Sequence, residues 1–365
     1  MAKKNNNSNF RDIKYIKLAY EQASINLGST STNPSVGCVV VKNNSVISSG
    51  YTSLNGRPHA EKNALEKNEN YKNSDLYVTL EPCSHYGKTP ACINNIIHKK
   101  IRRVIFSTYD IDERSKKKSE KKLKNKKIVV KKFILAKLAK KFYQSYFLQT
   151  TTQLPFIDAK LAISNDLFTI NKKNKWITNI KSRRLGNFLR SKYDCLLTTS
   201  KTINVDDPLL DCRIEGLEKK TPVLCIVDRS FIINKNSKIF KEKNRKIYIF
   251  VITKNEAKEK YLKDRGIRII RFSQNYKADQ HLIKMFYFIK KLGFHRILIE
   301  SGITFLNQML RFKMIKNFYL FKTPINLKSK GSNNSNILLI KKLKISKKNK
   351  IGVNLKEDSL YKVQL

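Results

Sequence analysis

The chain has 365 residues, with 75 Lys and Arg against 28 Asp and Glu, and a formal net charge of +47. That length is enough for two domains with separate cores. No apolar run approaches the ~20 residues of a membrane span, and the basic N-terminus has no apolar segment behind it, which excludes a secretory signal. The six cysteines are too sparse for a disulfide scaffold. We therefore expect a cytoplasmic protein without a membrane partner.

The positive charge does not by itself indicate a nucleic-acid-binding protein. Lys, Asn and Ile are frequent along the whole chain, as an AT-rich genome would produce. The densest basic run, residues 114–127, contains none of the aromatic residues that single-stranded nucleic-acid sites place between their cations. We interpret this run as a solvated loop or charged helix and expect no specific nucleic-acid partner. Non-specific binding of polyanions at low salt stays open.

The predicted elements alternate between helix and strand, which indicates an α/β fold. In chain order, the expected elements of the first domain are a helix over residues 10–28, strands at 38–41 and 46–47, a helix over 59–68, a strand at 75–80, a helix over 90–98, a strand at 104–106 and a helical stretch ending at 147. Residues 150–153 are the expected linker, so the predicted domains span 1–148 and 149–365. The strands expected in the second domain lie at 155–162, 194–198, 222–227, 246–252, 267–270 and 296–299. The polar tail after Lys328 is expected to be poorly ordered.

A group of zinc-ligand residue types stands out in the first domain: His59-Ala60-Glu61, then Pro82-Cys83, then Cys92. One imidazole and two thiolates suit zinc and leave its fourth tetrahedral position open for water. A Glu two residues after the His, together with Pro-Cys, is typical of zinc-dependent deaminases, in which the Glu shuttles protons. Two expected helix starts would deliver the three ligands.

Two alternatives to a catalytic zinc site are weaker. The three residues could be scattered core residues, but chance would rarely also supply the Glu, the Pro and the strand before them. A closed structural zinc site would need a fourth protein ligand. His85 is the nearby candidate, and with Glu61 present we interpret His85 as a pocket residue.

The spacing of the two thiols is unusual for a deaminase. The usual second half of the site is Cys-x-x-Cys, whereas eight residues separate Cys83 from Cys92 here. With this longer loop, the first half of the chain closely resembles the bifunctional deaminase–reductase family of riboflavin biosynthesis. The matching segments are 32–34, 36–40, 59–61 and 82–92.

The second half resembles the reductase part of the same family. Its clearest signature is Thr202-x-x-x-Asp206-Asp207-Pro208-x-Leu210-x-x-Arg213, preceded by Lys160-x-Ala162-x-Ser164-x-Asp166 and followed by Glu300-x-Gly302. The resemblance implies a cytidine-deaminase-like zinc domain followed by a dihydrofolate-reductase-like domain. The chain has no Gly-x-Gly-x-x-Gly, so a Rossmann cofactor loop is not supported.

The resemblance also implies the chemistry. Zinc-dependent hydrolytic deamination of 2,5-diamino-6-(5-phosphoribosylamino)pyrimidin-4-one would be followed by reduction of the ribosyl group to ribityl by NADPH. Zinc would be held by His59, Cys83 and Cys92, with Glu61 as the catalytic proton shuttle. The substrate-binding residues implied are Asn33, His85, Lys88, Lys160, Asn174, Arg190, Leu210, Arg213 and Glu300. Those implied for NADPH are Ile163, Trp176, Thr202, Asp206, Arg229 and Gly302. We expect a small phosphorylated pyrimidine as partner and a homo-oligomer.

The chain departs from the family pattern at a few positions. Leu167 stands where the family usually has Gly, Arg229 where it has a small residue, and Ser301 where Gly or Ala is commoner. After Asp110, the lysine run replaces the family's Pro-Asn and Gly-x-Gly. Two rival functions stay open: a zinc deaminase of nucleic acid such as tRNA, and a non-enzymatic, basic, zinc-containing nucleic-acid-binding protein.

Overall fold

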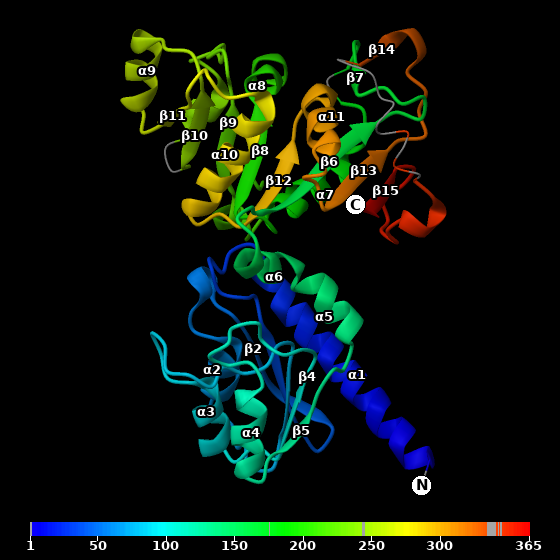
Figure 1. Cartoon of the computed structure of the whole chain (residues 1–365). Helices are drawn as coiled ribbons and strands as arrows, with labels where there is room; N and C mark the ends of the chain where they lie inside the picture. The colour runs from blue at the N-terminus through cyan, green and yellow to red at the C-terminus, as the bar shows by residue number, and fades with distance from the viewer. Residues whose placement is uncertain (1, 175, 243–244, 334–340, 342, 344) are drawn as a thin grey trace. The chain divides into compact units, whose positions relative to one another are not determined.

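The structure, a computed structural model, describes residues 2–174, 176–242, 245–333, 341, 343 and 345–365 (Figure 1). The chain divides into two compact units, Met1–Thr152 and Gln153–Leu365. Within the described residues, no helix has both the length and the apolar character needed to cross a membrane.

The first unit is built on a five-stranded mixed sheet of order β2-β1-β3-β4-β5. Its strands are β1 (Gly37–Lys42), β2 (Ser45–Tyr51), β3 (Asp75–Val78), β4 (Arg103–Phe106) and β5 (Val129–Lys131). Its helices are α1 (Ala2–Ile25), α2 (Ala60–Leu65), α3 (Cys92–His98), α4 (Lys118–Asn125), α5 (Ala136–Phe142) and α6 (Gln144–Thr151). The pairs β3–β4 and β4–β5 are parallel, whereas β1 is antiparallel to both of its neighbours.

Two glycines let helices approach the sheet closely from opposite sides. A Cβ on Gly37 would lie 1.8 Å from the carbonyl oxygen of Ala19 in α1, and a Cβ on Gly50 would lie 2.6 Å from the backbone nitrogen of Ala64 in α2. Gly50 pairs with Cys38, the neighbour of Gly37. Because successive residues of a strand face opposite sides, α1 and α2 cover opposite faces of the sheet. This arrangement places the start of α2 beside the sheet, where it carries the predicted site.

The second unit is built on an eight-stranded sheet of order β11-β10-β9-β8-β12-β6-β13-β15. Its strands are β6 (Phe156–Ile163), β8 (Cys195–Thr199), β9 (Val223–Val227), β10 (Ile247–Val251), β11 (Arg268–Arg271), β12 (Arg296–Glu300), β13 (Asn317–Lys322) and β15 (Ser359–Gln364), with β7 (Ile170–Asn171) and β14 (Gly331–Ser332) in a separate two-stranded sheet. Its helices are α7 (Ile180–Arg190), α8 (Ser200–Asp206), α9 (Glu256–Lys263), α10 (Ala278–Lys291) and α11 (Ile303–Arg311). All neighbouring strands of the large sheet are parallel except β13 and β15. Short 3-10 turns are found at Leu54–Gly56 in the first unit and, in the second unit, at Glu218–Lys220, Lys238–Lys241, Lys328–Lys330 and Lys347–Asn349.

A parallel sheet is buried on both faces, and this one has a core on each. Ile297 and Ile299 of β12 pack into one cluster with residues of α10 and α11. Leu298, between them, packs into another cluster with Ile203 of α8 and Leu262 of α9. The alternation of side chains along a strand thus explains why these strands read as continuous apolar runs.

The predicted helix and strand types are confirmed for most elements, and several details are corrected. The helix expected over residues 59–68 ends at Leu65. The lysine run forms α4, anchored by the buried Leu123. Strands β5, β7, β13, β14 and β15 were not predicted. The expectation of a poorly ordered tail is wrong for β15, which pairs with β13 over six residues, while residues 334–340, 342 and 344 lie outside the described part of the chain.

Candidate active sites

The predicted zinc ligands come together at one edge of the first sheet. His59 is the N-cap residue of α2, and Cys92 is the first residue of α3. The expectation that two helix starts deliver all three ligands is wrong for Cys83, which lies in the loop that follows β3. Its carbonyl oxygen accepts a hydrogen bond from the backbone nitrogen of Ile93 at 3.3 Å, which ties this loop to α3. Two helix starts and one loop therefore supply the three side chains.

The separations between the ligand atoms suit a tetrahedral zinc ion. His59 Nδ1 lies 3.7 Å from Cys83 Sγ and 3.4 Å from Cys92 Sγ, and all three ligand atoms lie within 4.8 Å of one another. Zinc bonds of about 2.0 Å to nitrogen and about 2.3 Å to sulfur in tetrahedral geometry put N and S about 3.5 Å apart. The residues present therefore fit zinc without rearrangement. No fourth protein ligand belongs to this cluster among the described residues.

The two thiols are not equivalent. Hydrogen bonds from Cys92, the larger effect, and from His59 lower the pKa of the Cys83 thiol. The backbone nitrogen of Cys92 donates to Cys83 Sγ at 3.2 Å, which stabilises the thiolate form. The hydrogen bond with Cys83 and burial raise the pKa of Cys92. Of the two thiols, Cys83 is therefore the one whose surroundings favour the thiolate form.

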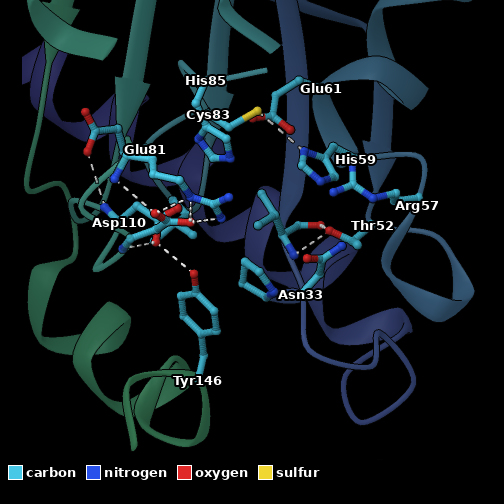
Figure 2. Close-up of a pocket in the computed structure, with 15 residues that line it drawn as sticks. Asn33, Thr52, Arg57, His59, Glu61, Glu81, Cys83, His85, Asp110 and Tyr146 are labelled. Carbon is cyan, nitrogen blue, oxygen red and sulfur yellow. Dashed lines mark hydrogen bonds and ion pairs between the residues drawn. The ribbon is translucent and has the colours of Figure 1, made fainter. Parts of the chain in front are cut away.

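Glu61 lies in the first turn of α2, and its side chain is buried, with 4% of the residue exposed. Burial, with the neighbouring Cys83 adding to it, raises the pKa of the Glu61 carboxyl group, and His59 opposes this rise. In Figure 2 the side chains of Glu61, His59 and Cys83 converge. A carboxyl group with a raised pKa beside the open position of a metal is suited to take up and release a proton near neutral pH.

The zinc-ligand cluster opens into a pocket with an empty volume of about 540 Å³, part of it open solvent. Asn33 and His85, two predicted substrate residues, line this pocket. Asn33 donates to the carbonyl oxygen of Gly56 at 2.8 Å, and His85 Nδ1 lies 2.9 Å from Ser115 Oγ. Lys88, the third, is exposed and is not part of the lining. Its role in substrate binding stays a prediction.

Several pocket residues were not predicted as site residues from the sequence. They are Pro34, Val36, Thr52, Arg57, Leu80, Glu81, Asp110, Asp112, Arg114 and Tyr146. Asp110 had a usable signal: Cys83 follows β3 and Asp110 follows β4, and the carboxyl ends of adjacent parallel strands meet at the same edge of a sheet. Tyr146 had none, because its hydrogen bond to Asp110 Oδ1, at 2.8 Å, joins residues 36 positions apart.

The segment that replaces the family's Pro-Asn and Gly-x-Gly supports the loop around Cys83. Ser115 is fully buried, and its Oγ accepts a hydrogen bond from the backbone nitrogen of Ser84 at 3.2 Å in addition to contacting His85. Glu81 accepts hydrogen bonds from the backbone nitrogens of Asp110 and Lys117, although burial raises its pKa to about 7. The basic segment therefore has a structural role despite its departure from the family pattern.

In the second unit, three predicted substrate residues form one cluster. Lys160 of β6 pairs in register with Glu300 of β12, and its Nζ lies 3.7 Å from Glu300 Oε2. Arg190, at the end of α7, bonds both carboxylate oxygens of Glu300, at 2.6 and 3.0 Å. Burial alone would raise the pKa of Glu300, but Arg190 and Lys160 outweigh it and lower the pKa to about 2. Glu300 is therefore a carboxylate at neutral pH.

Arg213 and Leu210 lie on the loop after α8. Arg213 Nε contacts Asp211 Oδ1 at 3.0 Å, and the Arg213 side chain is 55% exposed. Leu210 is buried. Arg190 donates to the carbonyl oxygen of Asp211 at 2.9 Å, so this loop is joined to the Glu300 cluster through one arginine.

Thr202 and Gly302, two predicted NADPH residues, are in contact at the carboxyl ends of β8 and β12. The backbone nitrogen of Gly302 donates to Thr202 Oγ1 at 3.3 Å. Nearby on the same strand ends, the buried hydroxyls of Thr198 and Ser301 have no hydrogen-bond partner among the described residues. Buried hydroxyls are normally satisfied. Gly302 is also the N-cap residue of α11, whose N-terminus favours an anion. These features fit the phosphate-bearing cofactor NADPH.

The remaining predicted NADPH and substrate residues are held by other contacts. Ile163, at the end of β6, is buried, and Asp206 is the last residue of α8. Trp176 is half exposed, with the Arg183 guanidinium 4.6 Å from its ring centre. The last two, Asn174 and Arg229, are exposed. The backbone nitrogen of Asn174 donates to Asn171 Oδ1, and the carbonyl oxygen of Arg229 accepts hydrogen bonds from the backbone nitrogens of Ile252 and Thr253. Their roles stay predictions.

Leu167 shows a physical reason for one departure. Its φ of 69° lies in the left-handed region, where glycine is favoured. Leu167 keeps this conformation while its side chain packs against the core, and its carbonyl oxygen accepts a hydrogen bond from Asn333 at 3.2 Å. Leu167 thus adopts a backbone conformation that a glycine would favour at this position.

Comparisons with known proteins agree with both sites. The family model of the cytidine and deoxycytidylate deaminase zinc-binding region matches residues 10–108, and that of the RibD C-terminal domain matches residues 155–354. Riboflavin biosynthesis protein RibD of Aquifex aeolicus is 32% identical over 316 residues, which cover 86% of this chain and 87% of the relative. RibD of Buchnera aphidicola subsp. Baizongia pistaciae is 32% identical over 368 residues, which cover 95% and 97%. The solved structure of Acinetobacter baumannii RibD, form 1, has a TM-score of 0.80 at 25% identity and covers 98% of this chain and 99% of that one.

A zinc-dependent deaminase unit followed by a reductase unit makes the chain a two-domain deaminase–reductase. Since the RibD C-terminal domain covers more than half of the chain and relatives match almost its full length, the chain belongs to the RibD family of riboflavin biosynthesis proteins. It is a bifunctional enzyme with zinc and NADPH as cofactors. The predicted family, fold class, pair of activities and cofactors are confirmed.

Proposed function

We propose that the first unit deaminates 2,5-diamino-6-(5-phosphoribosylamino)pyrimidin-4-one and that the second unit reduces the ribosyl group of the product to ribityl. A solved protein of similar fold is named as a diaminohydroxyphosphoribosylaminopyrimidine deaminase and 5-amino-6-(5-phosphoribosylamino)uracil reductase. The observation that carries the proposal is the cluster of His59, Cys83 and Cys92, with separations suited to zinc, beside the buried Glu61.

In the deaminase site, His59, Cys83 and Cys92 would hold zinc. Bound zinc lowers the pKa of water and supplies a nucleophile at neutral pH. Glu61 accepts one proton of the attacking water and delivers it to the pyrimidine ring nitrogen. It then takes the remaining proton of the added hydroxyl group, which becomes the carbonyl, and passes it to the amino group that leaves as ammonia. The raised pKa of Glu61 lets the same carboxyl group act as base and then as acid.

Asn33 and His85 would hold the substrate over the zinc site. Both line the pocket, and Asn33 is fixed by its hydrogen bond to Gly56. Because Ser115 contacts His85 Nδ1, the other ring nitrogen is left for the ligand. Lys88, exposed nearby in sequence, is proposed to meet the phosphate rather than the base.

In the reductase site, NADPH supplies a hydride to carbon 1 of the opened ribose. Lys160 is proposed to donate the proton that the nitrogen bonded to carbon 1 receives. Its ammonium group forms an ion pair with the Glu300 carboxylate. Arg190 is fully engaged with Glu300, Asn187 and Asp211, so we propose that it orients Glu300. Arg213, whose side chain is 55% exposed, is better placed for the phosphate, which a guanidinium binds with two parallel hydrogen bonds.

A coupled assay on the purified full chain tests the proposal. The diaminopyrimidinone phosphate is supplied, and ammonia release and NADPH oxidation are followed separately. We expect ammonia release without NADPH and substrate-dependent NADPH oxidation after deamination. Absence of ammonia release from the zinc-loaded chain would contradict the first assignment. Absence of NADPH oxidation with the deaminated product supplied directly would contradict the second.

The partner and location proposals follow from the same site. We propose a cytoplasmic enzyme without a specific nucleic-acid partner, because thiolate ligands suit a reducing compartment and α4 presents lysines without aromatic residues. Formation of inosine within tRNA incubated with the purified chain would favour the rival nucleic-acid deaminase. A homo-oligomer stays a prediction that light scattering during size-exclusion chromatography would test.

A further inference from the structure

The loop that follows α8, residues 207–213, has a constrained backbone. It is neither helix nor strand, and Asp207 and Leu210 have φ values of 39° and 57°. Residues other than glycine seldom adopt such conformations and keep them only where the surroundings impose them. The loop carries Leu210 and Arg213, which the family resemblance assigns to the substrate. The contacts that hold this loop in its conformation therefore affect how the reductase site is arranged.

Arg245, two residues before β10, binds this loop by its carbonyl groups. Its Nη1 donates to the carbonyl oxygen of Leu209 at 2.7 Å, and its Nη2 donates to that of Leu210 at 2.9 Å. Its Nε donates to the carbonyl oxygen of Pro222, just before β9, at 3.0 Å. One guanidinium group thus joins the loop to the start of β9 through three hydrogen bonds.

The next carbonyl of the loop is bound by another guanidinium group. Arg190 donates to the carbonyl oxygen of Asp211 while it pairs with Glu300. Three consecutive carbonyl groups, at residues 209, 210 and 211, therefore accept hydrogen bonds from two arginines. This pattern fixes the left-handed turn at Leu210 and sets where the following residues, up to Arg213, leave the loop.

Arginine is the residue that this arrangement requires. Its five N–H donors form a rigid planar fork, whereas lysine is a single point of charge on a flexible stem. Burial lowers the pKa of Arg245 to about 10, so the environment disfavours the charge. Its three hydrogen bonds go to backbone carbonyl oxygens and not to a carboxylate, so they stabilise the shape of the loop and not an ion pair.

We propose that Arg245 is a positioning residue of the reductase site, which holds residues 207–213 in the conformation that presents Leu210 and Arg213 to the substrate. The inference rests on the proposed reductase function. It differs from a general effect on folding because Thr202 and Gly302, on the cofactor side, are joined by their own hydrogen bond, which does not involve Arg245.

The test compares Arg245→Met, Arg245→Lys and the control Arg265→Met in the full chain. Arg265 is an exposed arginine of the same unit that also donates to one backbone carbonyl, that of Tyr261. For Arg245→Met we expect the KM for the deaminated substrate to rise tenfold or more and the KM for NADPH to stay within twofold. Arg245→Lys should give an intermediate rise, Arg265→Met should match the parent chain, and ammonia release by the first unit should be unchanged throughout.

Hydrogen exchange of the peptide that contains residues 207–213 provides a readout independent of activity. We expect at least tenfold faster exchange in Arg245→Met than in the parent chain or Arg265→Met. If Arg245→Met does not fold, the same comparison is made with Arg245→Lys.

A substrate KM within twofold of the parent value, an equal rise in both KM values, or unchanged exchange would overturn the inference. A parent chain that does not oxidise NADPH would refute the proposed function, and the exchange comparison would still decide whether Arg245 holds the loop.

Discussion

The two sites are assembled in different ways. In the first unit, the proposed zinc ligands and Glu61 all lie between residues 59 and 92, and they come from two helix starts and one loop. In the second unit, the Glu300 cluster joins side chains from β6, α7 and β12, which are 140 positions apart at the extremes, Lys160 and Glu300. The comparison teaches that chemistry concentrated in a short segment can be read locally, whereas a site built from buried charges depends on the packing of a whole sheet.

The sites also differ in how they tolerate the loss of one member. We expect the first unit to keep its fold if the Glu61 carboxyl group is neutralised, because burial raises the pKa of this group and already disfavours its charged form. In the second unit, Glu300 is buried, the Arg190 side chain is only 11% exposed, and the two are bonded to each other. Removal of Glu300 leaves the Arg190 guanidinium in a largely buried place without its carboxylate partner, which is strongly destabilising.

The largest expected effect comes from Glu61→Gln. Loss of the proton shuttle should lower the rate of ammonia release by about a thousandfold or more, with zinc content and NADPH oxidation of supplied product unchanged. Glu66→Gln, at the exposed C-terminal end of the same helix, is the control and should be neutral. Steady-state kinetics and elemental analysis check both variants. Retention of a tenth of the activity by Glu61→Gln would remove Glu61 from this role.

The next largest effect tests the buried pair through stability. Glu300→Gln should lower the free energy of unfolding of the second unit by about 3–5 kcal/mol at pH 7, because it leaves Arg190 buried without its partner. The exposed pair of Lys254 and Glu256 supplies the control, since Glu256→Gln should cost at most about 1 kcal/mol. Urea denaturation gives both values. Equal losses in the two variants would contradict the distinction between the sites.

The same variant has a defined pH dependence. The pKa of Glu300 is lowered in the folded chain from 4.5 to about 2. Its stabilising contribution is therefore complete above pH 4.5 and is lost as the pH falls toward 2. The difference between the parent chain and Glu300→Gln should be constant from about pH 7 to 5 and should shrink between about pH 4 and 3. A difference that grows on acidification would show that Glu300 is not paired as a carboxylate.

A smaller effect is expected at the support of the deaminase pocket. Ser115→Ala removes the contact with His85 Nδ1, a hydrogen bond worth about 1 kcal/mol. We therefore expect kcat/KM for deamination to fall about fivefold. Ser119→Ala, which removes the hydrogen bond of a buried serine in the same segment to the carbonyl oxygen of Pro82, should leave His85 in place. An equal loss of kcat/KM in the two variants would mean that Ser115 does not act through His85 and that its segment only supports the loop around Cys83.

The smallest effect concerns the charge of the lysine run. Lys118, Lys121 and Lys126 are exposed on and beside α4. Their joint replacement by Gln should change the free energy of unfolding by less than about 0.5 kcal/mol for each site and should leave kcat/KM of both reactions within twofold. Chemical denaturation and the coupled assay check this. A large loss of deamination would mean that the run contacts the substrate.

Much of the first site could be predicted because its residues carry chemistry that is recognisable by spacing. His59, Glu61, Cys83 and Cys92 stand out in the sequence alone, and the alternating apolar runs predict most strands. Residues such as Tyr146 could not be found, because contacts over 36 positions leave no periodic signal. Arg57 and Asp112 line the pocket but resemble ordinary surface charges in the sequence.

The strands that escaped prediction have physical reasons as well. β15 reads Ser-Leu-Tyr-Lys-Val-Gln, whose alternation of polar and apolar residues is hidden at the end of a polar tail, and it forms the edge of the sheet beside β13. β5 is only three residues long and follows the lysine run. In both cases the tertiary pairing, and not the local sequence, decides the strand.

X-ray absorption spectroscopy of the purified, zinc-loaded chain, combined with elemental analysis, tests the central claim most directly. We predict one zinc per chain, with two sulfur ligands at about 2.3 Å and two nitrogen or oxygen ligands at about 2.0 Å. In the Cys92→Ser variant, we expect zinc to have only one sulfur ligand. A metal-free chain, or zinc surrounded by four protein ligands without an open position, would contradict the account.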